Sequence, residues 1–147
     1  EKVGYAPDLD ALLRGSDIVS VNLVLSETTR GLFGAREFAL MRPDALLLNT
    51  SRGPIVQVAP LLEALRAGRL SGAALDVHDV EPLPEGAPVL DRALIDSGRL
   101  LVTPHLGYVS EQTFRIFYRQ TAEAIAAWKA GSPIRVIEAG RQVTPPT

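Results

Sequence analysis

The sequence is 147 residues long, with 15 basic against 17 acidic side chains, no cysteine and 46% hydrophobic residues. This length suits one compact domain with a sizeable core. A net charge of −2 lacks the positive excess of nucleic-acid-binding proteins, and the apolar runs are far shorter than the roughly 20 residues that span a bilayer. The absence of cysteine excludes disulfide scaffolds, thiolate zinc sites and thiol nucleophiles. We expect a cytoplasmic protein that binds neither nucleic acid nor membrane.

Four short apolar runs have the composition of buried strands. They begin at Ile18, Ala45, Ala73 and Leu100, so successive starts lie 27, 28 and 27 residues apart, the scale of a strand–helix–strand unit of roughly 30 residues. The runs are nearly continuous rather than alternating, which is typical of strands covered on both faces of a parallel sheet. The expected strands are 17–23, 45–49, 73–77 and 100–103.

Helical patterns separate these strands. The sequence predicts Asp8 as the N-cap of the first helix and Ser110 as the N-cap of the longest. In the third, Pro60 suits the first turn and Gly68 marks the end. The expected helices are 7–13, 34–41, 59–67, a single turn at 92–96, and 110–130.

Three other segments do not follow the strand–helix alternation. The proline-rich stretch 81–88 cannot form a regular helix, and long loops beside a sheet are more often functional than structural. Residues 134–137 are apolar enough for an edge strand, and the last residues predict a flexible tail.

Ligands of open parallel sheets bind outside the carboxyl ends of the strands. Four chemically competent side chains, Arg52, Asp76, Glu81 and His105, follow the predicted strands at that edge. Arginine holds a carboxylate in a bidentate fork, and histidine and glutamate suit proton transfer. Taken singly, Arg52 also suits a surface ion pair, and the histidine and glutamate suit solvated loop positions. An aspartate that closes an apolar run needs a partner, because a lone buried charge is costly.

A metal site is an alternative use of the same region. His78, Glu81 and His105 match a set of two histidines and one carboxylate. Proton transfer remains the favoured hypothesis, since the first two residues lie in a proline-bounded loop without a rigid element to fix them.

Four motifs occur in a fixed order along the chain. They read LNTSRGPIV from Leu48, GAALDV from Gly72, EPLP from Glu81 and TPHLG from Thr103. Together they resemble the second half of a D-isomer-specific 2-hydroxyacid dehydrogenase. The resemblance implies an α/β fold, a Rossmann-like parallel sheet with flanking helices.

The resemblance also implies a domain organisation. Residues 1–109 correspond to the carboxyl-terminal half of the NAD(P)-binding domain, 110–137 to a long helix and short strand that return to a substrate domain, and 138–147 to a flexible tail. The family's glycine-rich phosphate loop is absent from the 147 residues, and the first residue is not methionine. We therefore expect a fragment of a longer enzyme that is inactive alone.

Carried over to this sequence, the resemblance assigns three catalytic roles. Arg52 binds the substrate carboxylate, His105 protonates the carbonyl oxygen as hydride arrives from the reduced nicotinamide of the cofactor, NAD or NADP, and Glu81 stabilises the charged imidazole. The substrate is a 2-oxo acid or D-2-hydroxy acid, and the full-length enzyme is a homodimer. The cofactor-binding residues that it implies are Leu23, Val24, Thr50, Ser51, Asp76, Leu106 and Gly107.

The sequence departs from the family pattern at two places. Val24 follows the first predicted strand where members often have proline, which leaves the cofactor contacts of that loop open. His78 stands where members often have an aromatic residue; it could tune substrate choice or be a solvated bystander. The alternative function is a dinucleotide-sensing binding protein on the same fold, as in the family's co-repressor relatives.

Overall fold

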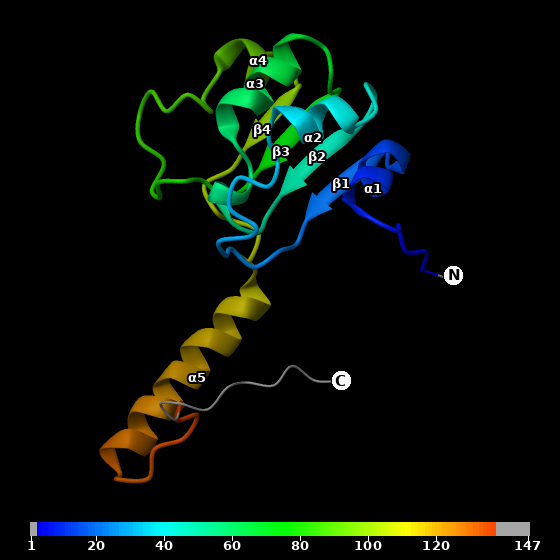
Figure 1. Ribbon diagram of the computed structural model, residues 1–147. Coiled ribbons are helices and arrows are strands. Elements are labelled where there is room, and N and C mark those ends of the chain that lie inside the picture. The colour runs from blue at the N-terminus through cyan, green and yellow to red at the C-terminus, as the bar shows by residue number, and fades with distance from the viewer. Residues whose placement is uncertain (1–2, 138–147) are drawn as a thin grey trace. The chain divides into compact units, whose positions relative to one another are not determined.

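A four-stranded parallel sheet forms the centre of the computed structural model, which describes residues 3–137 (Figure 1). The strands lie across the sheet in chain order, so each crossover leads to the adjacent strand and all carboxyl ends meet at one edge. The four strands predicted from the sequence are confirmed, with shorter bounds: β1 (Ile18–Val21), β2 (Leu46–Asn49), β3 (Gly72–Leu75) and β4 (Leu100–Val102).

Helices connect the strands where the sequence predicts them. The Asp8 carboxylate accepts the Ala11 N–H at 2.7 Å, and the Ser110 hydroxyl accepts the Thr113 N–H at 3.1 Å, which confirms both N-caps. A short 3-10 turn after β2 was not foreseen. The helical elements are α1 (Leu9–Gly15), α2 (Ala35–Leu40), η1 (Gly53–Ile55), α3 (Val58–Arg66), α4 (Arg92–Asp96) and α5 (Glu111–Lys129).

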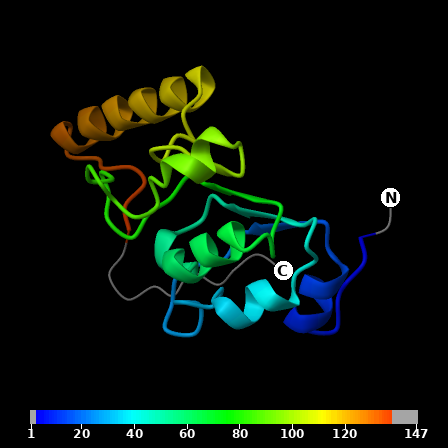
Figure 2. The same ribbon diagram turned by 90° about the horizontal axis from the view of Figure 1, so that it is seen from above.

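The core lies between the sheet and one layer of helices. Figure 2 shows α1, α2 and α3, coloured blue to green, side by side along one face of the sheet. Side chains from that face, such as Val19 and Leu47, are buried. The opposite face is more open than the sequence predicts, since Ile18 is 58% and Leu101 61% exposed among the described residues. Side chains along these unbroken apolar runs therefore alternate between a covered and an open face of the sheet.

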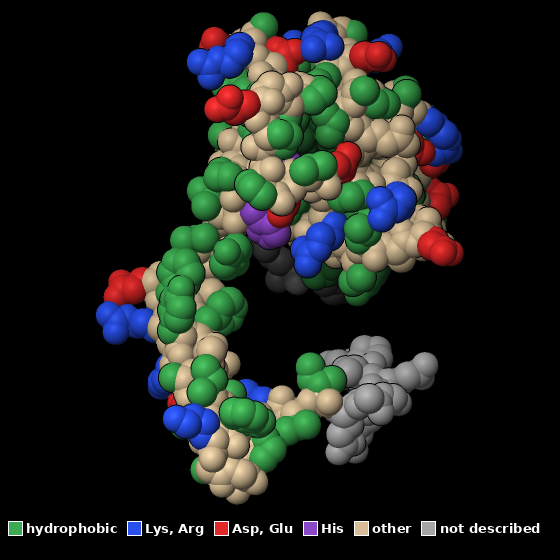
Figure 3. Space-filling model, turned by 90° about the vertical axis from the view of Figure 1, so that its left-hand side faces the viewer, with side chains coloured by type: hydrophobic (Ala, Val, Ile, Leu, Met, Phe, Trp, Pro, Cys, Tyr) green, Lys and Arg blue, Asp and Glu red, His purple; other side chains and the backbone are tan. Residues whose placement is uncertain are grey.

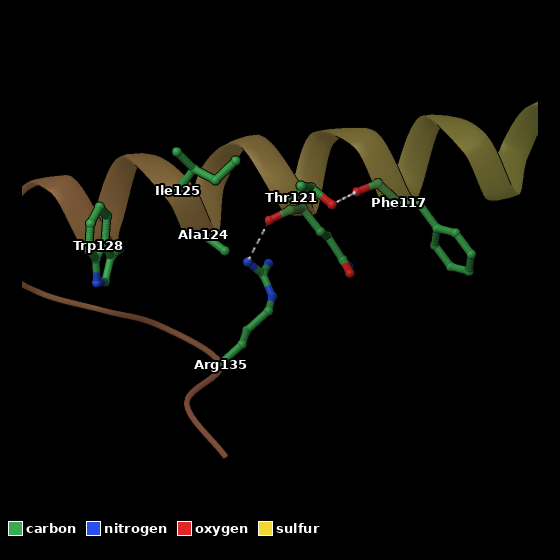
Figure 4. A pocket seen from close by; sticks show the side chains of 7 residues that line it. Phe117, Thr121, Ala124, Ile125, Trp128 and Arg135 are labelled. Atoms are coloured by element: carbon green, nitrogen blue, oxygen red, sulfur yellow. Dashed lines mark hydrogen bonds between the residues drawn. The ribbon is translucent and has the colours of Figure 1, made fainter. Parts of the chain in front are cut away.

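The chain divides into two compact units, Glu1–Gly107 and Tyr108–Thr147. The second unit contains α5, in which no residue is buried, and Figure 3 shows hydrophobic side chains along this helix. A cavity of about 590 Å³ lies between α5 and the segment that follows it (Figure 4). No helix among residues 3–137 is both long and apolar enough to cross a membrane.

The edge strand expected at 134–137 is wrong. Arg135 has a φ of 56°, in the left-handed region, which interrupts an extended backbone. Its guanidinium donates to the Gln120 carbonyl at 3.4 Å (Figure 4). It also donates to a carboxylate oxygen of Glu123 at 2.9 Å, so it ties the segment to α5. The tail predicted over 138–147 lies outside the described residues.

Two leucines on opposite faces of the sheet test this account of the core. Leu47 is 0% exposed, so Leu47→Ala leaves a cavity and should lower the free energy of unfolding by about 2–5 kcal/mol. The matched control is Leu101→Ala on the open face, where the change should stay within about 0.5 kcal/mol. Urea unfolding of the chain measures both, and equal losses would contradict a one-sided core.

Candidate active site

The predicted chemical groups lie in the loops that leave the carboxyl ends of the strands. Leu23 and Val24 follow β1, and residues 50–52 follow β2. Residues 76–81 follow β3, and residues 103–107 follow β4. Because the strands are parallel and adjacent, these loops share one edge of the sheet.

The loop after β2 is held by a buried amide. Asn49 is 0% exposed; its Nδ2 donates to the Arg52 carbonyl at 3.0 Å, and its Oδ1 accepts the Ser51 N–H at 3.1 Å. The Ser51 hydroxyl donates to the Leu23 carbonyl, which ties this loop to the one after β1. Asn49 was missed in the sequence, although a polar residue that closes an apolar run is the signal that singled out Asp76.

The loops after β1 and β2 enclose a small cavity of about 270 Å³, which residues 22–25, Ser51 and Arg52 line. Arg52 is exposed and donates one N–H to the Ser51 carbonyl at 2.6 Å. A guanidinium carries five N–H donors, so this contact leaves it able to hold a carboxylate. Thr50 is exposed and does not line the cavity, whereas Leu23 and Val24 do.

Gly53 brings the Arg52 loop against the loop after β3. A Cβ at this position would lie 2.1 Å from the carbonyl carbon and 2.4 Å from the carbonyl oxygen of His78. Only glycine permits this approach of two backbones. It places Arg52 beside the segment that leads to Glu81.

Glu81 and His105 are joined by a hydrogen bond, with Oε2 2.7 Å from Nδ1. The other oxygen of Glu81 accepts the His78 backbone N–H at 2.9 Å. The contact with His105 is the largest cause that holds the pKa of the Glu81 carboxyl below its usual value, and the His78 N–H adds to it. His105 has a φ of 59°, a left-handed conformation that is uncommon for a residue with a side chain.

Asp76 holds the turn that carries His105. Its carboxylate is buried and accepts the Thr103 hydroxyl at 2.5 Å and the N–H groups of Leu106 and Gly107 at 2.7 Å each. Burial raises the pKa of the Asp76 carboxyl, but these three hydrogen bonds outweigh it, so the pKa lies below the usual value. Thr103 was missed in the sequence. A threonine at the end of an apolar strand gives no sign that its hydroxyl bonds the Asp76 carboxylate.

His78 is not a solvated bystander, because it is only 7% exposed. Its Nε2 lies 2.9 Å from the Thr103 carbonyl oxygen, and it meets Glu81 through its backbone N–H rather than its ring. This geometry overturns the alternative of a metal held by His78, Glu81 and His105. Among residues 3–137, no group of three or more histidine, cysteine, aspartate or glutamate side chains could hold a metal ion.

The acceptor role of Asp76 predicts a pH-dependent loss of stability. Asp76→Asn places an amide N–H against backbone N–H donors and should lower the free energy of unfolding at neutral pH by about 1–3 kcal/mol. The folded-state pKa lies below the usual value of 3.8, so the stabilisation is present above that value and is lost as the pH falls through the folded pKa. The gap between wild type and variant should therefore narrow in acid.

Urea unfolding from neutral pH to pH about 3 measures this gap. The matched control is Asp79→Asn, an exposed aspartate three residues further along the same loop, which should change stability by no more than about 0.5 kcal/mol. A gap that stays constant with pH would contradict the role of Asp76.

Comparison with known proteins places this geometry in a family. Residues 1–107 match the family described as D-isomer specific 2-hydroxyacid dehydrogenase, NAD binding domain. The chain is 36% identical over 132 residues to glycerate dehydrogenase of Methylorubrum extorquens, covering 90% of this chain and 41% of that protein. It is 41% identical over 106 residues to glyoxylate/hydroxypyruvate reductase B of Shigella boydii, covering 72% of this chain and 31% of that protein.

A solved structure agrees with the sequence relatives. The crystal structure of a D-isomer specific 2-hydroxyacid dehydrogenase from Xanthobacter autotrophicus Py2, in complex with NADPH and MES, is 41% identical, with a TM-score of 0.64. The match covers 86% of this chain and 50% of that chain. The chain spans less than half the length of the two curated relatives. On these matches and the parallel sheet, the chain belongs to the D-isomer specific 2-hydroxyacid dehydrogenase family, in its NAD-binding domain.

Proposed function

We propose that this chain provides the catalytic sheet edge of an oxidoreductase that interconverts a 2-oxo acid and a D-2-hydroxy acid with NAD(H) or NADP(H). The observation that carries the proposal is the Glu81–His105 pair, 2.7 Å apart, on the same edge as Arg52. An imidazole beside a carboxylate is a general acid–base arrangement, and membership of the family supports its use here.

His105 is the proton donor and acceptor in this proposal. The Glu81 carboxylate bonds Nδ1 and orients the ring, so the imidazole delivers its proton to the carbonyl oxygen through Nε2. In the reverse direction the neutral ring accepts the proton of the 2-hydroxyl group. The left-handed backbone of His105, fixed through Asp76, sets the direction from which the ring meets the substrate.

Arg52 binds the substrate in this proposal. Its guanidinium takes the carboxylate of the 2-oxo acid in a bidentate fork and leaves the carbonyl oxygen toward His105. Asn49 and Gly53 hold the backbone on either side of it, which restricts where the carboxylate can sit.

The cavity at the ends of β1 and β2 fits one end of the cofactor. Its volume of about 270 Å³ is below the roughly 300–1,000 Å³ of pockets that enclose a drug-sized ligand, so it suits the nicotinamide rather than a whole dinucleotide. Leu23, Val24 and Ser51 would line that ring. Asp76 does not line the cavity, and its part in cofactor binding stays a prediction. The bound nicotinamide supplies or accepts the hydride. The N–H groups of Leu106 and Gly107 bond Asp76, so we assign these two residues to the turn.

The names of the relatives suggest which substrates to assay first. One is a glycerate dehydrogenase and another a glyoxylate/hydroxypyruvate reductase, so hydroxypyruvate and glyoxylate are the first 2-oxo acids to test. We also propose a cytoplasmic homodimer, as the family resemblance implies; light scattering and cell fractionation measure these two properties.

Replacing His105 tests the function. In the full-length gene product, His105→Ala should lower kcat for reduction of hydroxypyruvate or glyoxylate by about 10²–10⁴-fold, the usual contribution of a positioned acid. The matched control is His78→Gln, which keeps an N–H donor at the other histidine and should keep most of the activity. An unchanged kcat in His105→Ala would refute the mechanism. NADH binding without turnover of any 2-oxo acid would favour the dinucleotide-sensing alternative.

Replacing Glu81 tests the pairing through kcat. Its carboxylate bonds Nδ1 of His105 and so fixes the ring that delivers the proton. Glu81→Ala removes this acceptor, so kcat for reduction should fall by about 10-fold or more, the scale of a lost hydrogen bond to a charged group. Steady-state kinetics measure the loss, and Glu85→Ala, an exposed glutamate in the same loop, serves as the control. A kcat that stays at the wild-type value would show that Glu81 does not position His105.

A further inference from the structure

His78 is a buried histidine for which the proposed chemistry has no use. It is 7% exposed, and its Nε2 lies 2.9 Å from the carbonyl oxygen of Thr103. A carbonyl oxygen only accepts hydrogen bonds, so Nε2 carries the proton and donates. A buried imidazole with one committed donor is a fixed structural link.

This link joins the two segments that carry the acid–base pair. His78 lies three residues before Glu81 in the loop after β3, and Thr103 lies two residues before His105 after β4. The Thr103 hydroxyl donates to Asp76, which in turn holds the turn at His105. The imidazole of His78 therefore ties the Glu81 loop to the same carboxylate network that orients its partner.

The surroundings of His78 show why this hydrogen bond from His78 to the Thr103 carbonyl, called the tether below, is needed. On one side, the close approach of Gly53 prevents the His78 backbone from moving toward the Arg52 loop. On the other, the loop borders a cavity of about 550 Å³ between the start of α3 and the proline-rich segment, with His78 and Val80 in its lining. Without a link to β4, the loop has room to shift in that direction, and Glu81 would move with it.

We propose that His78 is a positioning residue whose imidazole, bonded to the Thr103 carbonyl, holds the Glu81 carboxylate on His105. The expected effect of His78 on kcat rests on the proposed function. Its effect on the distance between Glu81 and His105 does not, and a measurement without turnover tests it.

The kinetic test uses three variants of the full-length gene product. His78→Phe keeps the ring volume and removes the donor, and should lower kcat about fivefold, the scale of one lost hydrogen bond, with KM for the 2-oxo acid unchanged because Arg52 lies on another loop. His78→Gln places an amide N–H near the position of Nε2 and should restore kcat. Val80→Ala, in the same loop and 62% exposed in the wild type, should have no effect.

The outcomes separate positioning from a general effect on the loop. Wild-type kcat in His78→Phe would overturn the proposal, as would equal losses in the Phe and Gln variants, or a loss in Val80→Ala as large as in His78→Phe. The thermal midpoint of each variant shows whether it is folded. If His78→Phe does not fold, the test is the kcat of folded His78→Gln. A kcat of His78→Gln below that of Val80→Ala would then count against the tether.

A second measurement does not depend on activity. His78 and His105 are the two histidines of the 147-residue chain, so His105 alone contributes imidazole signals in His78→Phe. In proton NMR spectra, the proton between His105 Nδ1 and Glu81 should exchange slowly with water in the wild type and in His78→Gln. It should exchange faster in His78→Phe. The same slow exchange in all three would overturn the tether. Absence of 2-oxo acid reduction by the wild type would instead refute the proposed function and leave this result to decide the inference.

Discussion

The site depends on one buried carboxylate. Asp76 directly follows β3 and carries a charge with almost no exposure to water, and such a charge is stable only when its oxygens are bonded. Its partners are the Thr103 hydroxyl and the N–H groups of Leu106 and Gly107, which come from the end of β4. The requirement to satisfy Asp76 thus shapes the neighbouring loop and keeps His105 in a left-handed conformation.

The same device occurs one strand earlier. Asn49 is the last residue of β2, whereas Asp76 comes directly after β3, and the fully buried amide of Asn49 bonds the loop that carries Arg52. The two sites differ in charge. The Asn49 amide both donates and accepts within its own turn, whereas the Asp76 carboxylate only accepts, and its donors come from the segment that follows β4. As a result, Arg52 is fixed locally and His105 is fixed by a contact between strands.

Much of the fold could be predicted from the sequence, because apolar runs, caps and breakers act over a few residues. The strands and Asp8 and Ser110 as caps are of this kind. The burial of His78 could not be predicted, since it depends on a carbonyl 25 residues away, nor could the partners of Asp76. Residues 134–137 failed as a strand for a related reason: a strand needs a neighbour, and Arg135 bonds a helix instead.

The proposed acid–base pair is more exposed than the groups that hold it. The side chains of His105 and Glu81 are 38% and 35% exposed, so water screens the attraction between them. The buried groups Asn49, Asp76 and His78 keep their geometry with or without a ligand, because their partners are within the protein. A substrate held by Arg52 over the pair would exclude that water and strengthen the coupling where the proton moves. In the proposed mechanism, the buried groups fix the geometry of the pair before the substrate binds, and the attraction between Glu81 and His105 reaches its full strength in the bound state.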